Sequence, residues 1–403
     1  MLDIGKRAGT RYVLVAGSII ALVAACSPTA TNPPAGSAAA TSAPAGSAGA
    51  TASEGASSSG PIKIAIIDAQ SGQLSSLGAD EVQGVTLAVN AANAAGGIDG
   101  RQIQLQTFDD KGDPTTSTNV AQAVVSGGYI FVFGPAESTD TIAVAPILNK
   151  AQIPLITSGQ SDAIANLHDP FVFLNTPTSS AFDSTLATYA VTTKGYKSIA
   201  MISNNDSYGK SEHDAFLTAL KALGVTPVAD QVVTPDQKDF SSALTSIRQT
   251  NPQALFIGAE EVESGLIVNQ AKSLGLTAQI IGGAPILAVP FLQTAGPNAD
   301  GCIGTSPYIG NNVNDQTKAF AAAIQKAYGA TPDLHQAKAY DGAQIVILAL
   351  KQTHGQGGKA LADAIRATKY NGLVGSFSFD ADGVGVHQTQ LAVIQNGQAV
   401  PLQ

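Results

Sequence analysis

From residue 61 onward, short apolar runs alternate with longer segments of helical periodicity. The apolar runs are bounded by polar turns, as buried strands are, and cover residues 62–67, 103–108, 129–133, 154–156, 198–202, 254–257 and 278–281. The helical segments between them cover residues 84–95, 115–126, 141–151, 180–193, 212–223, 240–249 and 263–274. Repeated strand–helix–strand units form parallel sheets with right-handed crossovers. The sequence therefore predicts an α/β fold.

The alternating pattern contains more strands than one ordinary doubly wound sheet holds, and it restarts after residues 176–178. Two similar lobes explain both observations. A single (β/α)8 barrel is the alternative, but the C-terminal third breaks the alternation. That third predicts helices over residues 316–328, 336–353 and 359–367, followed by a strand pair around the Asp-Gly turn in 375–383 and a further strand over 390–395.

The amino-acid composition argues against nucleic acid as a partner. The chain has 403 residues, a formal charge of -9, and only 13% charged residues, which is not the composition of a nucleic-acid-binding protein. The hydrophobic fraction of 44% is enough for packed cores and excludes a disordered protein.

The N-terminus carries an export signal. Lys6, Arg7 and Arg11 precede an uncharged stretch that is too short for a mature transmembrane helix, and small residues then lead to Cys26. This pattern resembles a lipobox, so we expect a lipoprotein signal peptide over residues 1–25 and a membrane anchor on lipidated Cys26. A plain signal peptide cleaved near residue 25 is the alternative. Residues 27–60 consist almost entirely of Ser, Pro, Thr, Ala and Gly, so residues 26–60 are predicted to be the lipidated cysteine and a flexible tether.

Motifs for catalysis are missing from the sequence. There is no nucleophile elbow, HExxH, paired CxxC or phosphate loop, and the five histidines lack metal-ligand spacing. We predict neither an enzyme nor a cofactor or metal site, and we expect Cys302 to be a buried residue without a disulfide partner. Clefts between paired lobes bind ligands, so a binding function is predicted.

Specific residues then indicate a family. The matching positions run in order along the chain and include Ser71, Gly72, Gly78, Asn93, Gly96, Gly97, Asp99, Gly100, Asp109, Asp110, Gly134, Pro135, Ser138, Thr139, Asp206, Tyr208, Gly209, Lys238, Asp239, Phe240, Tyr340 and Asp341. This order resembles the branched-chain amino-acid binding proteins of ABC importers across essentially all of residues 61–403. The resemblance implies a type I periplasmic binding protein fold, with two Rossmann-like lobes joined by a three-segment hinge. We expect residues 61–178 with 310–376 in lobe 1, and 179–309 with 377–403 in lobe 2.

The resemblance also implies a ligand site at the strand ends. The carboxylate of the solute would meet Ser138 and the turn formed by Gly159, Gln160 and Ser161, where helix N-termini favour an anion. Both serines could instead be simple N-caps. Tyr208 matches an aromatic residue of the second lobe that closes over the ligand.

Four positions depart from the family pattern. Ala284 stands where amino-acid binders carry the acid that pairs with the ligand ammonium, and Glu260, at a neighbouring strand end, could replace that acid or be a solvated helix start. Leu77 and His335 stand where aromatic residues often contact the ligand. The histidine suggests a polar or anionic ligand tail.

These observations predict an extracytoplasmic solute-binding lipoprotein that captures a branched-chain or related amino acid by lobe closure and delivers it to the permease subunits of an ABC transporter. We expect a monomer that binds a small-molecule solute and no nucleic acid. A solute without an ammonium group, such as an amide, urea or an aromatic carboxylate, is an alternative ligand, and a ligand sensor is an alternative role.

Overall fold

The computed structural model describes residues 60–310 and 314–402, all within one compact unit, Ser58–Gln403. The predicted signal peptide, Cys26 and the tether up to residue 59 lie outside the described residues. No helix in the described part of the chain is both long and apolar enough to cross a membrane.

The first sheet has five parallel strands in the order β2-β1-β3-β4-β5. These strands are β1 (Ile62–Asp68), β2 (Ile103–Asp109), β3 (Phe131–Phe133), β4 (Leu155–Thr157) and β5 (Val172–Leu174). The helices among them are α1 (Ser75–Ala94), α2 (Pro114–Gly127), α3 (Ser138–Lys150) and α4 (Asp162–Ala165). Alternate residues of β1 face opposite layers: Ile64 packs in a core with Val85 of α1, whereas Ala65 packs with Val124 of α2 and Leu148 of α3. Both faces of the sheet are therefore covered.

The second sheet has seven strands in the order β15-β14-β10-β9-β8-β6-β7. Its parallel strands are β6 (Ile199–Asn204), β7 (Ala229–Val233), β8 (Ala254–Gly258), β9 (Gln279–Gly282) and β10 (Ile303–Ser306), and an antiparallel hairpin of β14 (Gln390–Gln395) and β15 (Gln398–Pro401) extends it. The helical segments are α5 (Ser179–Thr188), η1 (Tyr189–Thr193), α6 (Ser207–Ala222), α7 (Ser241–Gln249), α8 (Glu261–Ser273), η2 (Ala284–Leu287), α9 (Val289–Ala295) and η3 (Gly296–Ala299). Met201 of β6 packs with Phe216 of α6, and Ile202 packs with Ile267 of α8, so this sheet is also covered on both faces.

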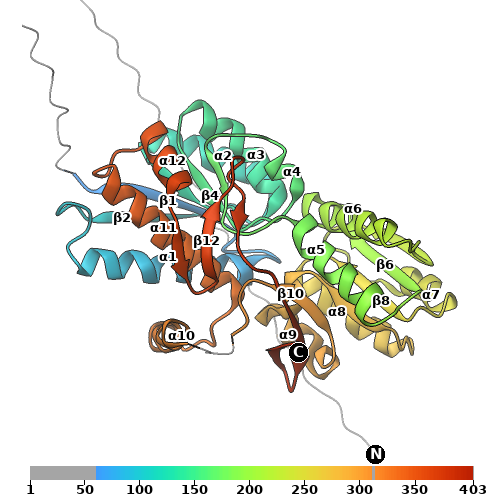
Figure 1. Ribbon diagram of the computed structural model, residues 1–403. Coiled ribbons are helices and arrows are strands. Elements are labelled where there is room, and N and C mark those ends of the chain that lie inside the picture. Colours follow the sequence, from blue (N-terminus) through green and yellow to red (C-terminus); the bar gives the residue numbers. More distant parts are fainter. Residues whose placement is uncertain (1–59, 311–313, 403) are drawn as a thin grey trace, which may run out of the picture. The chain divides into compact units, whose positions relative to one another are not determined.

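The chain then returns to the first sheet. The remaining elements are α10 (Asp315–Tyr328), α11 (Leu334–Gln352), α12 (Gly358–Ala367), β11 (Tyr370–Gly372), β12 (Gly375–Phe379) and β13 (Gly385–Val386). Helix α11 lies against α1, as Figure 1 shows, and the approach is close at Gly84, where a Cβ atom would lie 2.3 Å from the Gln336 carbonyl oxygen. The α/β fold with two lobes is confirmed. The barrel alternative is wrong, because the strands form two separate large sheets.

The predicted lobe boundary between residues 376 and 377 falls inside β12. This strand pairs with β11 and β13, and Val384 forms an isolated bridge with Leu174 of the first sheet. We therefore propose that lobe 1 extends to residue 386 and that the last crossing to lobe 2 precedes β14. The turn predicted between 375 and 383 is present, since Phe379 pairs with Gly385 across it.

Several elements differ from the prediction. Strand β5 is a buried apolar run of only three residues that the prediction missed. Edge strand β7 alternates between exposed and buried positions, and β10 contains Gly304, Thr305 and Ser306, so neither stands out as an apolar run. Helix α1 begins at Ser75 rather than at residue 84. In the first turn of this helix, Gly78 lies very close to the residue that follows β1. A Cβ atom on Gly78 would lie 1.9 Å from the Ala69 carbonyl oxygen, which explains a glycine inside a helix.

Candidate functional site

The carboxyl ends of strands from both lobes meet at one small cavity. The first lobe contributes residues after β3 and β4 and from α1 and α11, and the second lobe contributes residues after β6, β8 and β9. The lining consists of Leu77, Ala136, Ser138, Ser158, Gly159, Gln160, Tyr208, Glu260, Glu261, Pro285, His335 and Lys338.

The cavity brings together seven of the nine residues predicted for the ligand site: Leu77, Ser138, Gly159, Gln160, Tyr208, Glu260 and His335. Ser161 does not line it, but its backbone N–H donates to the Ser138 hydroxyl at 3.3 Å. Ala284 does not line it either, although the next residue, Pro285, does.

The two serines at the predicted anion subsite have different local roles. Glu137, not Ser138, caps α3, because its carboxylate accepts from the Asp140 N–H at 2.8 Å. The Ser138 hydroxyl is therefore free of capping and lies beside Gly159, where a Cβ atom would come within 3.2 Å of Ser138 Oγ. Ser161 does cap a helix, but α4 has only four residues, so its helix dipole adds little to anion binding.

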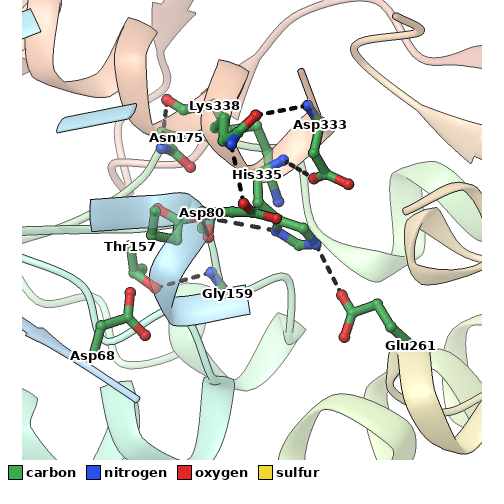
Figure 2. Close-up of polar contacts among 12 residues, drawn as sticks. Asp68, Asp80, Thr157, Gly159, Asn175, Glu261, Asp333, His335 and Lys338 are labelled. Carbon is green, nitrogen blue, oxygen red and sulfur yellow. Dashed lines mark hydrogen bonds and ion pairs between the residues drawn. The ribbon is translucent and has the colours of Figure 1, made fainter. Parts of the chain in front are cut away.

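A buried ion pair between His335 and Glu261 joins the two lobes at the cavity. The Nε2 atom of His335, on α11, lies 2.8 Å from Oε1 of Glu261, at the start of α8, and Nδ1 lies 3.8 Å from Oε1 of Glu81 on α1. Figure 2 shows the imidazole reaching from α11 to Glu261. Burial and Lys338 oppose protonation of His335, but the hydrogen bond with Glu261 and the nearby carboxylate of Glu81 outweigh them and raise its pKa to about 10. His335 is thus a cation held between two carboxylates.

Sequence reasoning missed Lys338, the second cation of the cavity. Lys338 is only 1% exposed, and its Nζ has no hydrogen-bond partner among the described residues. Burial lowers the pKa of this ammonium group. A signal exists in the sequence: Lys338 lies four residues after Leu334 and seven before Ile345, on the apolar face of its helix, where a charged residue is out of place.

Glu212 is a further acid that the sequence did not single out. It is fully buried, burial raises its pKa to about 7, and its carboxylate lies close behind Gly283, where a Cβ atom would be 2.3 Å from Glu212 Oε2 and 3.0 Å from the Tyr208 hydroxyl. Ala284, the residue after Gly283, is fully buried. Glu212 is therefore near the position of the missing family acid, but it does not line the cavity.

Next to the cavity, a second pocket between the lobes is strongly acidic. The carboxylates of Glu137, Asp206 and Glu260 offer oxygen atoms that lie within 4.8 Å of one another. Burial and Asp206 raise the pKa of Glu137 to about 7, and burial, Glu261 and Asp206 raise that of Glu260 well above its ordinary value. Glu260 lines both pockets and links them.

Hydrogen bonds join the lobes on either side of the cavity. The Ser207 N–H donates to Thr139 Oγ1 at 3.2 Å, and the Asp162 N–H donates to Ser211 Oγ at 2.8 Å. Thr139 and Asp162 belong to helices of the first lobe, whereas Ser207 and Ser211 belong to α6. The described arrangement is therefore a closed one, in which both lobes contact each other around the cavity.

Curated relatives are similar to this chain over most of their length. The Leu/Ile/Val-binding protein homolog 3 of Brucella melitensis is 28% identical over 292 residues, which cover 71% of this chain and 77% of the relative. The Leu/Ile/Val-binding protein of Escherichia coli K12 is 29% identical over 247 residues, 61% of this chain and 67% of the relative.

Solved structures share the fold. The branched-chain amino acid transporter substrate binding protein LivJ from Streptococcus pneumoniae, in complex with isoleucine, superposes with a TM-score of 0.78 at 29% identity over 84% of this chain and 97% of that one. A solute binding protein of an ABC transporter from R. palustris, in complex with benzoate, gives a TM-score of 0.80 at 22% identity over 85% and 96% of the two chains. The sequence model of the family described as Periplasmic binding protein matches residues 61–399, so the chain belongs to this family of ABC-transporter solute-binding proteins and has its type I fold.

Proposed function

We propose that this protein captures an amino acid, of the branched-chain kind or a related one, between its lobes and delivers it to the permease of an ABC importer. The observation that supports this best is a set of unpartnered polar atoms around the cavity. Each is a buried side-chain atom without a hydrogen-bond partner among the described residues: Gln160 Oε1, Tyr208 OH, His335 Nδ1 and Lys338 Nζ. Buried polar groups are normally paired, so a polar solute is the partner these atoms lack.

In this proposal the solute carboxylate binds on the first lobe. The Ser138 hydroxyl, the backbone of Gly159 and Gln160, and the adjacent Ser161 N–H surround one wall of the cavity. Leu77 and Tyr208 cover the solute from opposite lobes, and Glu260 pairs with its ammonium group. A buried cation needs such a partner, because desolvation without one is costly.

Lobe closure follows from the same contacts. A solute that touches both walls gains its second set of contacts only when the lobes meet, so binding shifts the population toward the closed state. The bonds from Thr139 to Ser207 and from His335 to Glu261 add to that state. The permease would then distinguish the closed protein from the open one, and no cofactor or catalytic step is required.

A second candidate is a solute without an ammonium group, such as an amide, urea or an aromatic carboxylate. Ala284 favours it, because a buried alanine cannot compensate a cation. Glu260 favours the amino acid, because it is an acid in the cavity lining itself.

The test is a thermal-shift and calorimetric titration of the purified protein, unfolded and refolded to remove carried solute. The panel holds leucine, isoleucine, valine, polar and acidic amino acids, urea, short amides and benzoate. A ligand that binds only the native state raises the melting temperature by mass action. A shift with any free amino acid supports the proposal, a shift with ammonium-free solutes alone supports the second candidate, and turnover of a bound solute would revive an enzymatic function.

Localisation has its own test. We propose that the mature protein is extracytoplasmic, tethered to the membrane by lipidated Cys26, and monomeric. Mass spectrometry of the N-terminal peptide should show a diacylglyceryl group on Cys26, and Cys26→Ser should release the protein from the membrane fraction. Release of an unmodified wild-type chain would instead support a plain signal peptide. Co-purification with a permease under crosslinking would separate a transport role from a sensor role.

A further inference from the structure

Lys338 is positioned so that only something in the cavity can complete its hydrogen bonding. Its backbone is fixed on α11, where its carbonyl oxygen accepts from Asn175 Nδ2 at 3.0 Å, as Figure 2 shows. Its side chain is buried and lines the cavity, yet Nζ has no hydrogen-bond partner among the described residues. A lysine ammonium offers three donors, and burying it unpaired is costly.

The nearby carboxylates do not satisfy Lys338, because they are engaged elsewhere. Glu261 bonds to His335, and Glu81 accepts from the Ser158 hydroxyl and faces the other nitrogen of His335. No carboxylate oxygen of the described residues comes within 4.0 Å of Lys338 Nζ. Lys338 therefore experiences the charge of Glu81 and Glu261 but forms no hydrogen bond to them.

The unpartnered atoms of the cavity are mostly donors. Lys338 Nζ and His335 Nδ1 come from the first lobe, the Tyr208 hydroxyl can donate from the second, and only Gln160 Oε1 is solely an acceptor. The carboxylate of an amino acid can occupy the subsite beside Ser138, but an aliphatic side chain supplies no acceptor to Lys338. A solute with a second oxygen-bearing group does.

We propose that Lys338 determines specificity, and that the solute is an amino acid whose side chain ends in a carboxylate or carboxamide oxygen that accepts a hydrogen bond from Lys338 Nζ. This inference rests on the proposed capture of an amino acid. A neutral carboxamide and a carboxylate both supply the oxygen acceptor that the leucine side chain lacks.

Three amino acids of nearly equal shape make a matched test. Leucine, asparagine and aspartate branch at the same carbon and differ in whether the terminal atoms are methyl groups, an amide or a carboxylate. We would titrate the refolded protein with all three, and with glutamine and glutamate for longer reach. We expect at least one oxygen-bearing member to bind ten-fold or more tightly than leucine, and the amide and acid arms identify which group it is.

Variants then assign the preference to Lys338. Lys338→Met keeps the length of the side chain and removes its donors, and it should lower the ratio of oxygen-bearing to leucine affinity at least ten-fold. Lys351→Met, exposed on the same helix, is the control and should leave the ratio unchanged. If Lys338→Met does not fold, the same affinity ratio measured for Lys338→Gln, together with the order of amino-acid affinities of the wild-type protein, still tests the role of Lys338.

The results of these titrations distinguish the proposed capture of an amino acid from the proposed role of Lys338. A wild-type protein that prefers leucine to every oxygen-bearing amino acid overturns the role of Lys338 and leaves amino-acid capture intact. A preference that survives Lys338→Met assigns the selectivity to another residue and also overturns it. A protein that binds no amino acid at all overturns both proposals.

Discussion

His335 and Glu261 join the two lobes through a buried hydrogen bond of 2.8 Å between Nε2 and Oε1. Both residues are less than 5% exposed. The histidine belongs to α11, which packs on α1 in the first lobe, and the glutamate begins α8 in the second. Because the pair exists only when the lobes meet, its energy belongs to the closed state rather than to either lobe alone.

Breaking this pair from one side should destabilise the closed protein strongly. His335→Gln leaves Glu261 buried without its cation, and Glu261→Gln leaves the histidine facing Glu81 alone. Removing one partner of a buried pair costs about 3–5 kcal/mol. We expect each variant to lower the free energy of unfolding by that order in urea denaturation, and the double variant to lose less than the sum of the two.

The exposed pair of His168 and Asp382 provides the matched control. Its side chains are 68% and 49% exposed, so His168→Gln should change stability by less than about 1 kcal/mol. Additive single-variant losses in the double variant would show that His335 and Glu261 are not coupled.

The carboxylates between the lobes should make closure depend on pH. Burial, with Asp206 across the interface, raises the pKa of Glu137 from 4.5 to about 7 in the closed form. The closed form therefore binds more protons than an open or unfolded one between these values. The contribution of Glu137 to the stability of the closed form is therefore full at or below pH 4.5 and is lost as the pH rises toward 7.

Glu137→Gln should remove much of this slope while keeping the cap on α3, because the amide oxygen can still accept from the Asp140 N–H. The measurement is the melting temperature and radius of gyration of the solute-free protein across this pH window, with a chelator present to keep cations from Glu137, Asp206 and Glu260. Parallel pH profiles for the variant and the wild type would contradict the assignment. His335 is present in both the variant and the wild type, so its contribution cancels from the difference between their pH profiles.

The sequence allowed the α/β fold and the two lobes to be predicted, because these depend on local apolar periodicity, whereas the ligand site at the strand ends was implied by the family resemblance. Strands β7 and β10 were missed where the signal is weak: one is a half-exposed edge and the other is rich in small polar residues. The elements that escaped prediction are thus those whose burial comes from their neighbours rather than from their own composition.

Within the site, the missed residues depend on tertiary packing. Lys338 lines the cavity only because α11 returns from far along the chain to pack on α1, and Glu261 appears in the sequence as an ordinary acid in the first turn of a helix. Glu260 and Glu261 are adjacent and chemically identical, and both line the two pockets, so only the structure assigns Glu261 to His335.

Glu260 and Glu212 are two acids that could pair with the ligand ammonium in place of the acid missing at position 284. We expect their variants to differ in ligand affinity. Glu260 lines the cavity, whereas Glu212 lies beside Gly283 and outside the cavity lining. We expect Glu260→Gln to weaken binding of an ammonium-bearing solute by ten-fold or more, since a desolvated ion pair is lost. Calorimetric titration of both variants is the measurement. If Glu212→Gln alone abolishes binding, the compensating acid is Glu212.

Ser138 should affect binding more than stability. Its hydroxyl is buried at the cavity wall, accepts only a long bond from the Ser161 N–H, and does not cap α3, so Ser138→Ala removes little from the folded protein. A hydrogen bond to a charged group contributes about 1.5–3 kcal/mol, which corresponds to roughly 10- to 150-fold in affinity. We therefore expect the dissociation constant for the solute to rise by at least ten-fold while the melting temperature of the solute-free protein stays within experimental error. Ser126→Ala, exposed near the end of α2, serves as the control and should alter neither quantity. An unchanged dissociation constant for Ser138→Ala would remove this hydroxyl from the proposed carboxylate subsite and leave the backbone of Gly159 and Gln160 as its main donors.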